Sequence, residues 1–491
     1  MEKSSVNQSS ELKEESVSFF ERITNSSILK LFIIFILTML MLIPMSLIND
    51  LVEERKNREN KVSEEVATKW GRDQVLSAPI LAVPYERIVD QVSKDSKGKE
   101  TIKKVLEEDW VFLLPDNSTV KTDIKPESLK RGIYSTVVYN ASIDISGSFG
   151  SFNMSDLPVD RAEMKWSKGK LIFGVEDVKG LSTFPVLTLG DSTYSLHMNN
   201  HLFDFFPNTM VADISLEKES GVGKIPFGIK LDLRGSKSLN FLPLANQTTI
   251  EAAGEWDNPS FNGGFLPEDR IVEKNSFKAN WGIPSFGRKL PAQWTSSGGR
   301  IYNFTGISLT DDYVTSNSVS AIDHISGTGM STDQDMVQIN FLAEVNNYQK
   351  ANRAAKYGIL VIVLTFASLF FTEIIKKKRI HMIQYILIGA GMVLFYGLLL
   401  AISEHLGFNI AYLLAAAATI LLIASFVQMI THDMKTSLLF AAILSLFYSF
   451  IYVLMQLRDY SLIVGMVGVF IILAVLMRVS GKINWYQFDK K

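Results

Sequence analysis

The chain contains no cysteine, and only six of its 491 residues are histidine. Without cysteine there can be no disulfide, no thiolate zinc site and no cysteine nucleophile. Net charge is also nearly absent, because 49 lysines and arginines are balanced by 51 aspartates and glutamates. This balance creates no broad positive field for nucleic acid, so we expect no nucleic-acid partner.

Motifs of common active sites are missing as well. No Gly-Lys pair has the glycine five positions earlier that a phosphate-binding loop requires, and no serine-hydrolase elbow is present. His197 and His201 are four residues apart, but Met-Asn-Asn separates them and the glutamate of a zinc-peptidase helix is absent. We therefore expect no catalytic residue, no cofactor, no metal and no enzymatic activity.

Long apolar runs are abundant but unevenly placed. A segment of about 20 apolar residues crosses the hydrocarbon core of a bilayer. Six segments fit this description, at 28–48, 357–375, 382–402, 408–430, 436–457 and 461–477. The last five are joined by short polar connectors, which predicts antiparallel helices packed as a bundle. Gly389 and Gly391, in the third segment, are small enough to allow close helix approach.

Basic residues predict the orientation of these spans. The first span has no small-residue cleavage site after its core, so we interpret it as an uncleaved signal anchor. The connector 376–379 is Lys-Lys-Lys-Arg, the C-terminal tail is basic, and the connector 403–409 has neither lysine nor arginine. By the positive-inside rule both termini are cytoplasmic, despite the basic residues at 55–61, because long domains translocate largely regardless of charge.

The stretch between the first two spans has the period of β-strands. From Ile133 to Ile145 apolar and polar residues mostly alternate, and Ile229 to Leu233 repeats the pattern. Clusters of Gly, Pro, Asn and Asp separate such runs, as turns require. Residues 53–69 are instead highly charged and predict a helix that continues out of the first span.

The predicted fold is therefore a membrane α-helical protein of six spans with a large extracytoplasmic, antiparallel, sandwich-like β-rich domain. The expected divisions are a polar cytoplasmic tail (1–27), the first transmembrane helix (28–48), a periplasmic β-rich domain (49–356), a five-helix transmembrane bundle (357–477) and a cytoplasmic tail (478–491).

Ionisable residues at the ends of the spans are the first candidates for function. Glu373 ends the second span, and Glu404 and His405 end the third. Charged groups at membrane depth are costly and often functional. On the predicted topology Glu373 and Glu404 lie on opposite sides of the membrane, so they cannot form one acid–base pair. The competing interpretation is that all three are interfacial groups that reach water or headgroups.

Several short motifs together resemble the CreD family of inner-membrane proteins, which are described as cell envelope integrity proteins. The likeness extends over nearly the whole length from about Ile28. It includes Ala78–Pro84, Arg131–Tyr134, Trp256, Phe265–Pro267, Ala355–Gly358 and Asn484–Tyr486. It is clearest from His381 through Gln384 to His405, and we add His381 and Gln384 to the candidates. The resemblance implies a bacterial inner-membrane protein with a large periplasmic domain, and it supplies no reaction.

Three functions stay open from the sequence. The periplasmic domain could bind an envelope protein or a cell-wall component while the bundle anchors it in the lipid bilayer. The chain could instead be an ion-coupled transporter that uses Glu373, Glu404 and His405. A membrane-embedded enzyme acting on lipid or cell-wall precursors through Glu404 and His405 is the third alternative.

Overall fold

The computed structural model describes residues 27–94, 100–153, 163–199, 203, 205–217, 223–287, 290–296, 335–341, 347–376, 380–457 and 460–481. The predicted tails 1–27 and 478–491 lie almost entirely outside these residues, and so does His201. The chain divides into two compact units: a helical unit of Met1–Arg58 and Val345–Lys491, and a β-rich unit of Glu59–Glu344.

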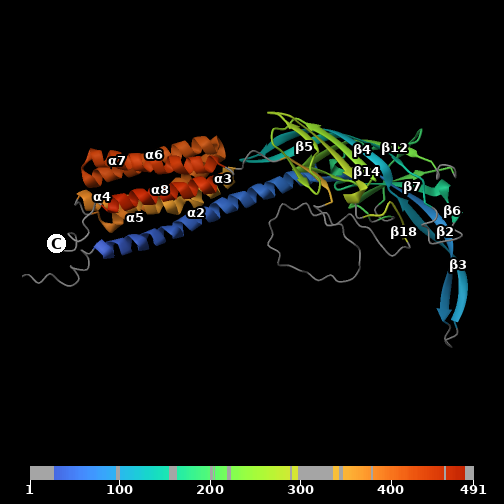
Figure 1. Ribbon diagram of the computed structural model, residues 1–491, viewed down its shortest axis with the longest axis horizontal. Helices are drawn as coiled ribbons and strands as arrows, with labels where there is room; N and C mark the ends of the chain where they lie inside the picture. Colours follow the sequence, from blue (N-terminus) through green and yellow to red (C-terminus); the bar gives the residue numbers. More distant parts are fainter. Residues whose placement is uncertain are drawn as a thin grey trace, which may run out of the picture. The chain divides into compact units, whose positions relative to one another are not determined.

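Seven helices of the described residues are numbered α2 to α8 (Figure 1). They are α2 (Ser27–Trp70), α3 (Asn347–Lys356), α4 (Gly358–Lys376), α5 (Met382–Leu406), α6 (Phe408–Thr431), α7 (Met434–Gln456) and α8 (Ser461–Ser480). Helix α2 continues through the charged segment 53–69, as predicted, and crosses the boundary between the two units at Arg58.

Five helical segments of the described chain are long and apolar enough to cross a membrane. They are Lys30–Trp70, Tyr348–Lys376, Met382–Leu406, Phe408–Thr431 and Met434–Gln456. The sixth predicted span coincides with α8, whose apolar stretch Ile463–Arg478 is shorter. Five of the six predicted spans therefore coincide with helices that could cross a membrane, and the count of six is not confirmed. Most large side chains of α8 are exposed, among them Met466 and Phe470.

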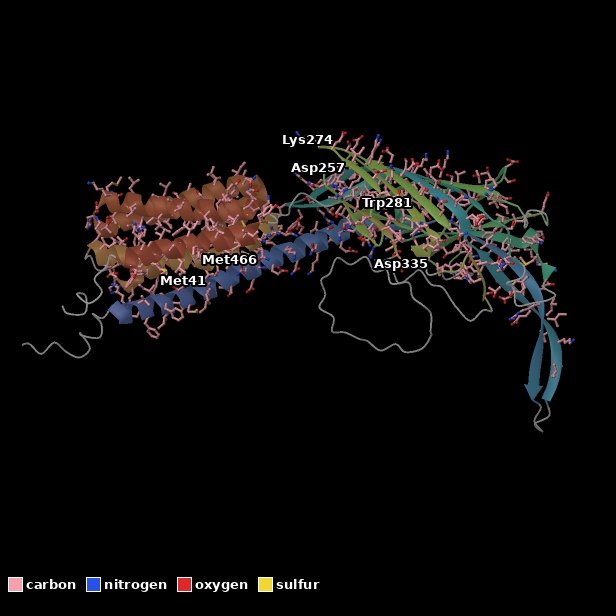
Figure 2. The ribbon with its side chains drawn as sticks, viewed as in Figure 1. Met41, Asp257, Lys274, Trp281, Asp335 and Met466 are labelled. Atoms are coloured by element: carbon pink, nitrogen blue, oxygen red, sulfur yellow. The ribbon has the colours of Figure 1, made fainter. Side chains whose placement is uncertain are left out.

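Helix α2 packs against α4 and α5 at two glycines. Met41 of α2 (Figure 2) contacts Gly389 so closely that a Cβ there would lie 2.8 Å from the Met41 Sδ atom. Met45, one turn further, meets Gly358, where a Cβ would lie 2.3 Å from the methionine methyl carbon. The flexible thioethers thus fill the space that the two glycines leave.

The helix α7 begins at a strong cap. The Asp433 carboxylate accepts hydrogen bonds from the N–H of Lys435 and from the hydroxyl of Thr436, at 3.1 and 2.6 Å. It also pairs with Lys376 at the end of α4, at 3.1 Å. The Thr436 hydroxyl, followed by Lys376 and the backbone, lowers the pKa of Asp433 to about 2. Asp433 therefore stays charged and fixes the start of α7.

The β-rich unit contains two sheets, in the part of the chain that is described. The larger sheet consists of β1 (Gln74–Ser77), β2 (Ile80–Lys94), β3 (Glu100–Leu113), β6 (Glu163–Met164), β7 (Gly169–Val175), β10 (His197–Met198), β11 (Asn208–Ile214), β13 (Ser238–Leu242), β15 (Pro259–Gly263), β18 (Gln293–Thr295) and β19 (Val337–Phe341). The smaller sheet consists of β4 (Pro115–Arg131), β5 (Tyr134–Phe149), β8 (Val186–Leu189), β9 (Ser192–Ser195), β12 (Ile225–Ser236), β14 (Gln247–Gly254), β16 (Asp269–Val272) and β17 (Phe277–Pro284).

Both sheets are mixed, so the prediction of an antiparallel fold is wrong in this respect. Most neighbouring strands are antiparallel, but β1 pairs with β13 in parallel, and β4 pairs with β14 in parallel. These partners are far apart in the sequence, and alternation within one strand cannot reveal the direction of its neighbour. The smaller sheet has the order β16-β17-β14-β4-β5-β12-β8-β9.

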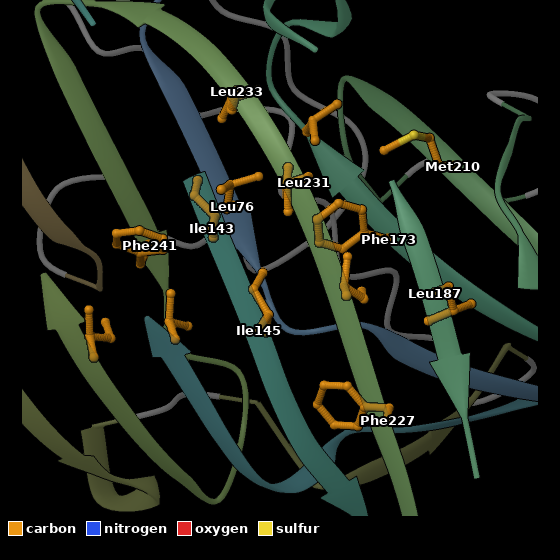
Figure 3. Close-up of a cluster of buried hydrophobic side chains, with 14 of the residues drawn as sticks. Leu76, Ile143, Ile145, Phe173, Leu187, Met210, Phe227, Leu231, Leu233 and Phe241 are labelled. Carbon is orange, nitrogen blue, oxygen red and sulfur yellow. The ribbon is translucent and has the colours of Figure 1, made fainter. Parts of the chain in front are cut away.

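The predicted period-two strands bury one face of the smaller sheet. In β5, Ile143 and Ile145 are buried, whereas Ser142 is exposed. In β12, Leu231 and Leu233 are buried between exposed charged residues. Their side chains meet those of the larger sheet, including Leu76 and Phe173, in one hydrophobic cluster (Figure 3). The opposite face of the smaller sheet is consequently left polar.

A titratable carboxyl lies directly after β7. Glu176 is half-buried, and its burial, together with the neighbouring carboxylates of Asp177 and Asp73, raises its pKa from 4.5 to about 7 against the effect of Arg72. A carboxyl with a raised pKa holds its proton more tightly in the folded state. Between pH 4.5 and about 7, stability therefore falls as the pH rises.

We expect Glu176→Gln to stabilise the β-rich unit by about 1 kcal/mol at pH 8, a value well below the full linkage energy because solvent screens a half-buried group. At pH 4 the carboxyl is largely protonated in both states, so the difference should vanish. Thermal unfolding of the full chain in detergent at both pH values measures this. An equal gain at pH 4 would assign the effect to packing instead.

Candidate functional site

Glu373 lies in a polar cluster at one end of the helical unit. It is 9% exposed. One carboxylate oxygen forms an ion pair with Lys30 of α2 and accepts a hydrogen bond from the N–H of Ile380 at 3.2 Å. The other accepts from the hydroxyl of Tyr385 at 3.3 Å. Lys30 also donates to the carbonyl of Ile380 at 3.4 Å. The cluster therefore joins α2, α4 and α5.

The local fold explains these contacts. Helix α4 ends at Lys376 and α5 begins at Met382, so Ile380 lies between them without helical partners for its N–H and carbonyl. Glu373 and Lys30 satisfy these two backbone groups. A buried carboxylate is tolerated in an apolar bundle when it is paired and hydrogen-bonded in this way.

Glu404 lies at the opposite end of α5. It is separated from Tyr385 by roughly 29 Å of helix, at about 1.5 Å per residue. The Tyr348 hydroxyl of α3 donates to Glu404 at 3.2 Å, and the Arg55 Nε atom of α2 lies 3.7 Å away. Arg55 and Tyr348 lie beside the two points where the chain passes from one unit to the other, at Arg58 and Val345. Glu404 therefore holds both connecting segments against α5.

We expect Tyr348→Phe to destabilise the helical unit by about 1–2 kcal/mol, because it removes a hydrogen bond to a charged, largely buried carboxylate. The measurement is thermal unfolding of the full chain in detergent. Tyr460→Phe, at a tyrosine that is 66% exposed, is the matched control and should leave the unfolding temperature unchanged. Equal effects of the two substitutions would contradict the role of the Glu404 contact.

The other three candidates have different positions. His381 is the N-cap of α5: its Nδ1 atom accepts from the Ile383 N–H at 3.4 Å, while the Gln384 side chain accepts from the His381 N–H at 2.9 Å. This reciprocal pair is a capping box, which gives both residues a structural role. His405 is exposed at the last turn of α5. None of the three contacts Glu373 or Glu404 through a hydrogen bond in the described chain.

A groove of about 920 Å³ lies on the polar face of the smaller sheet. Its floor follows residues that pair directly across neighbouring strands. The first row is Asp269, Asn280, Glu251, Lys121, Asp144 and Lys230. The second row is Ile271, Lys278, Ala253, Asp123, Ser142 and Asp232. The groove therefore crosses the strands and depends on the register of six of them.

Opposite charges meet along this floor. Lys121 lies 3.3 Å from Glu251, and Lys230 lies 3.5 Å from Asp144. The Ser142 hydroxyl donates to Asp232 at 2.6 Å. Cross-strand pairs of opposite charge favour the observed register. The side chains of all these residues are exposed or half-buried, so they are accessible to solvent and can form hydrogen bonds with a ligand.

Sequence reasoning missed the partners of both carboxylates and the groove. Lys30 is 343 residues from Glu373, and no local sequence pattern links the two. The groove has no local motif, because its residues come from strands whose order the sequence does not specify. No cluster of metal-ligating side chains occurs in the described portion of the chain.

Comparison with known proteins gives one family. The model of the family described as "Inner membrane protein CreD" matches residues 26–486. The chain is also 26% identical over 453 residues to inner membrane protein CreD of Escherichia coli strain K12, and the match covers 92% of each chain. The resemblance seen in the sequence is thereby confirmed, and with five helical segments able to cross a membrane this chain belongs to the CreD family of inner membrane proteins.

Proposed function

We propose that this inner-membrane protein contributes to cell envelope integrity by binding an envelope component in the groove of its β-rich unit, while the helical unit anchors it in the bilayer. The observation that carries the proposal is the groove itself. At about 920 Å³ it has the size of a ligand site, and its polar floor is formed by strands whose other face packs into the hydrophobic core.

The helical unit supports a role as an anchor more than one in transport or catalysis. Glu373 and Glu404 each have close partners, and Tyr385, which contacts Glu373, lies roughly 29 Å along α5 from Glu404. A carboxylate that carries a proton or ion must exchange its partners during each cycle, whereas these two hold helices together. We accordingly propose that the chain is not an enzyme and that its partner is an envelope protein or a cell-wall component.

The proposed topology places both termini in the cytoplasm and the β-rich unit in the periplasm, with α8 as a sixth span and the two sheets packed as a sandwich. The basic connector after α4 and the connector 403–409, which has neither lysine nor arginine, support this orientation. Because the chain has no cysteine, one introduced cysteine gives a clean test. Thr183→Cys should react with a membrane-impermeant maleimide once the outer membrane is permeabilised, and protection until lysis would contradict the topology.

Photocrosslinking in living cells tests the function. A photoreactive amino acid at Asn280, in the groove floor, should give a discrete crosslinked product. The same amino acid at Ser135, which is exposed on β5 outside the groove, is the control and should not give it. No product from Asn280, or the same product from both positions, would overturn the proposal.

A further inference from the structure

The charges of the groove exclude a strongly charged ligand. Five carboxylates line it (Asp123, Asp144, Asp232, Glu251 and Asp269), and four basic groups accompany them (Lys121, Lys230, Arg270 and Lys278). The cross-strand pairs Lys121–Glu251 and Lys230–Asp144 bring opposite charges together. The carboxylates would repel a polyanion, and the basic groups would repel a polycation. The groove is therefore electrostatically complementary to neither.

The same floor is rich in hydrogen-bonding capacity. A lysine ammonium has three donors, a carboxylate has about four acceptor sites, and one ion pair uses only a part of either. The Ser142 hydroxyl and the Asn280 side chain add groups that both donate and accept. Donors and acceptors alternate along the first row at the spacing of strands, about 4.8 Å. The complementary ligand is uncharged and carries many hydroxyl or amide groups.

Apolar side chains lie at both ends of this polar floor, on the same face of the sheet. Phe184, which precedes β8, is 89% exposed, and Ile271 in β16 is 61% exposed. Both line the groove. The strands β16 and β8 are the first and last of seven neighbouring strands, which extend over about 29 Å. An exposed aromatic ring offers a flat apolar surface for the C–H face of a sugar ring.

From these observations we infer that the groove binds a neutral, hydroxyl-rich glycan strand that lies across the β-strands, with one sugar stacked on Phe184. The inference rests on the proposed function, whose envelope component it assigns to the class of uncharged polysaccharides.

The test uses the full chain in lipid nanodiscs, which introduce no sugar-headed detergent. The probes are uncharged hexamers of β-1,4-linked N-acetylglucosamine and of β-1,4-linked glucose, and binding is followed by saturation-transfer NMR and calorimetry. We expect one of the hexamers to bind, with an affinity unchanged between 50 and 500 mM salt, since no net charge is neutralised. Phe184→Ala should weaken binding at least tenfold. Phe286→Ala removes an equally exposed ring, 94% exposed and outside the groove, and should change nothing.

Absence of binding by both hexamers, or equal binding by the wild-type chain and Phe184→Ala, would overturn the glycan assignment. The crosslinking experiment at Asn280 separates this failure from failure of the proposed function. A protein product that depends on the groove would leave the proposed function standing and replace the glycan by a protein partner. A carbohydrate-containing product would support both.

Discussion

Lys30→Met is expected to lower the free energy of unfolding of the helical unit by about 3 kcal/mol, because the Glu373 carboxylate loses its cation while it stays buried. This is at the low end of the effect for breaking a buried pair, since the Lys30 side chain is 26% exposed. The loss should be visible as a lower unfolding temperature of the full chain in detergent and as a reduced amount of protein in the membrane.

A second substitution distinguishes the ion pair from simple packing. Glutamine at position 373 is neutral, and its amide oxygen can accept from the Ile380 N–H while its amide nitrogen donates to the Tyr385 hydroxyl. Lys30→Met combined with Glu373→Gln should therefore lie within about 1 kcal/mol of the wild-type chain. Lys376→Met, which breaks the more exposed pair with Asp433, is the control and should lower the unfolding temperature far less than Lys30→Met. Additive losses in the double variant would contradict the pairing.

The positions of the apolar helices could be predicted from the sequence because each is a continuous apolar run, and hydropathy is a local property. Glu373 could be singled out for the same reason, as a charge at the end of such a run. Its partner could not, because which helix faces Glu373 depends on the packing of α2, whose Met41 and Met45 fit glycines of two other helices. His381 was a candidate for function, and the structure gives it a capping role.

The strands illustrate the same limit. Alternation correctly predicted which residues are buried in β12, and in β5 from Tyr139 to Ile145. At the start of β5 it did not, because Ser135 is exposed and Val138 is buried. It could not predict that β14 lies beside β4 in parallel, so that Glu251 is opposite Lys121. That pairing joins the halves of the groove floor. The groove is thus a property of strand order and register, and a sequence with the same alternation but another order would not form it.

Trp281→Ala is expected to destabilise the β-rich unit by about 4 kcal/mol, the usual range for truncating a fully buried aromatic residue. Trp281 (Figure 2) is 2% exposed, its ring lies 5.6 Å from that of Phe261, and its indole N–H donates to the carbonyl of Phe265 at 3.2 Å. It follows Asn280 on β17 and points to the opposite face, so it supports the groove floor from beneath.

Calorimetry of the full chain in detergent measures this loss, and Phe184→Ala provides the comparison. Phe184 is 89% exposed, so its truncation should leave the unfolding temperature unchanged while it lowers the affinity for the ligand. Trp281→Phe keeps most of the buried area but not the N–H donor. Its loss of unfolding free energy should lie between those of Phe184→Ala and Trp281→Ala, at about 1–2 kcal/mol. A loss below about 1 kcal/mol for Trp281→Ala would mean that the sheet closes over the missing ring, and that the groove does not depend on this core residue.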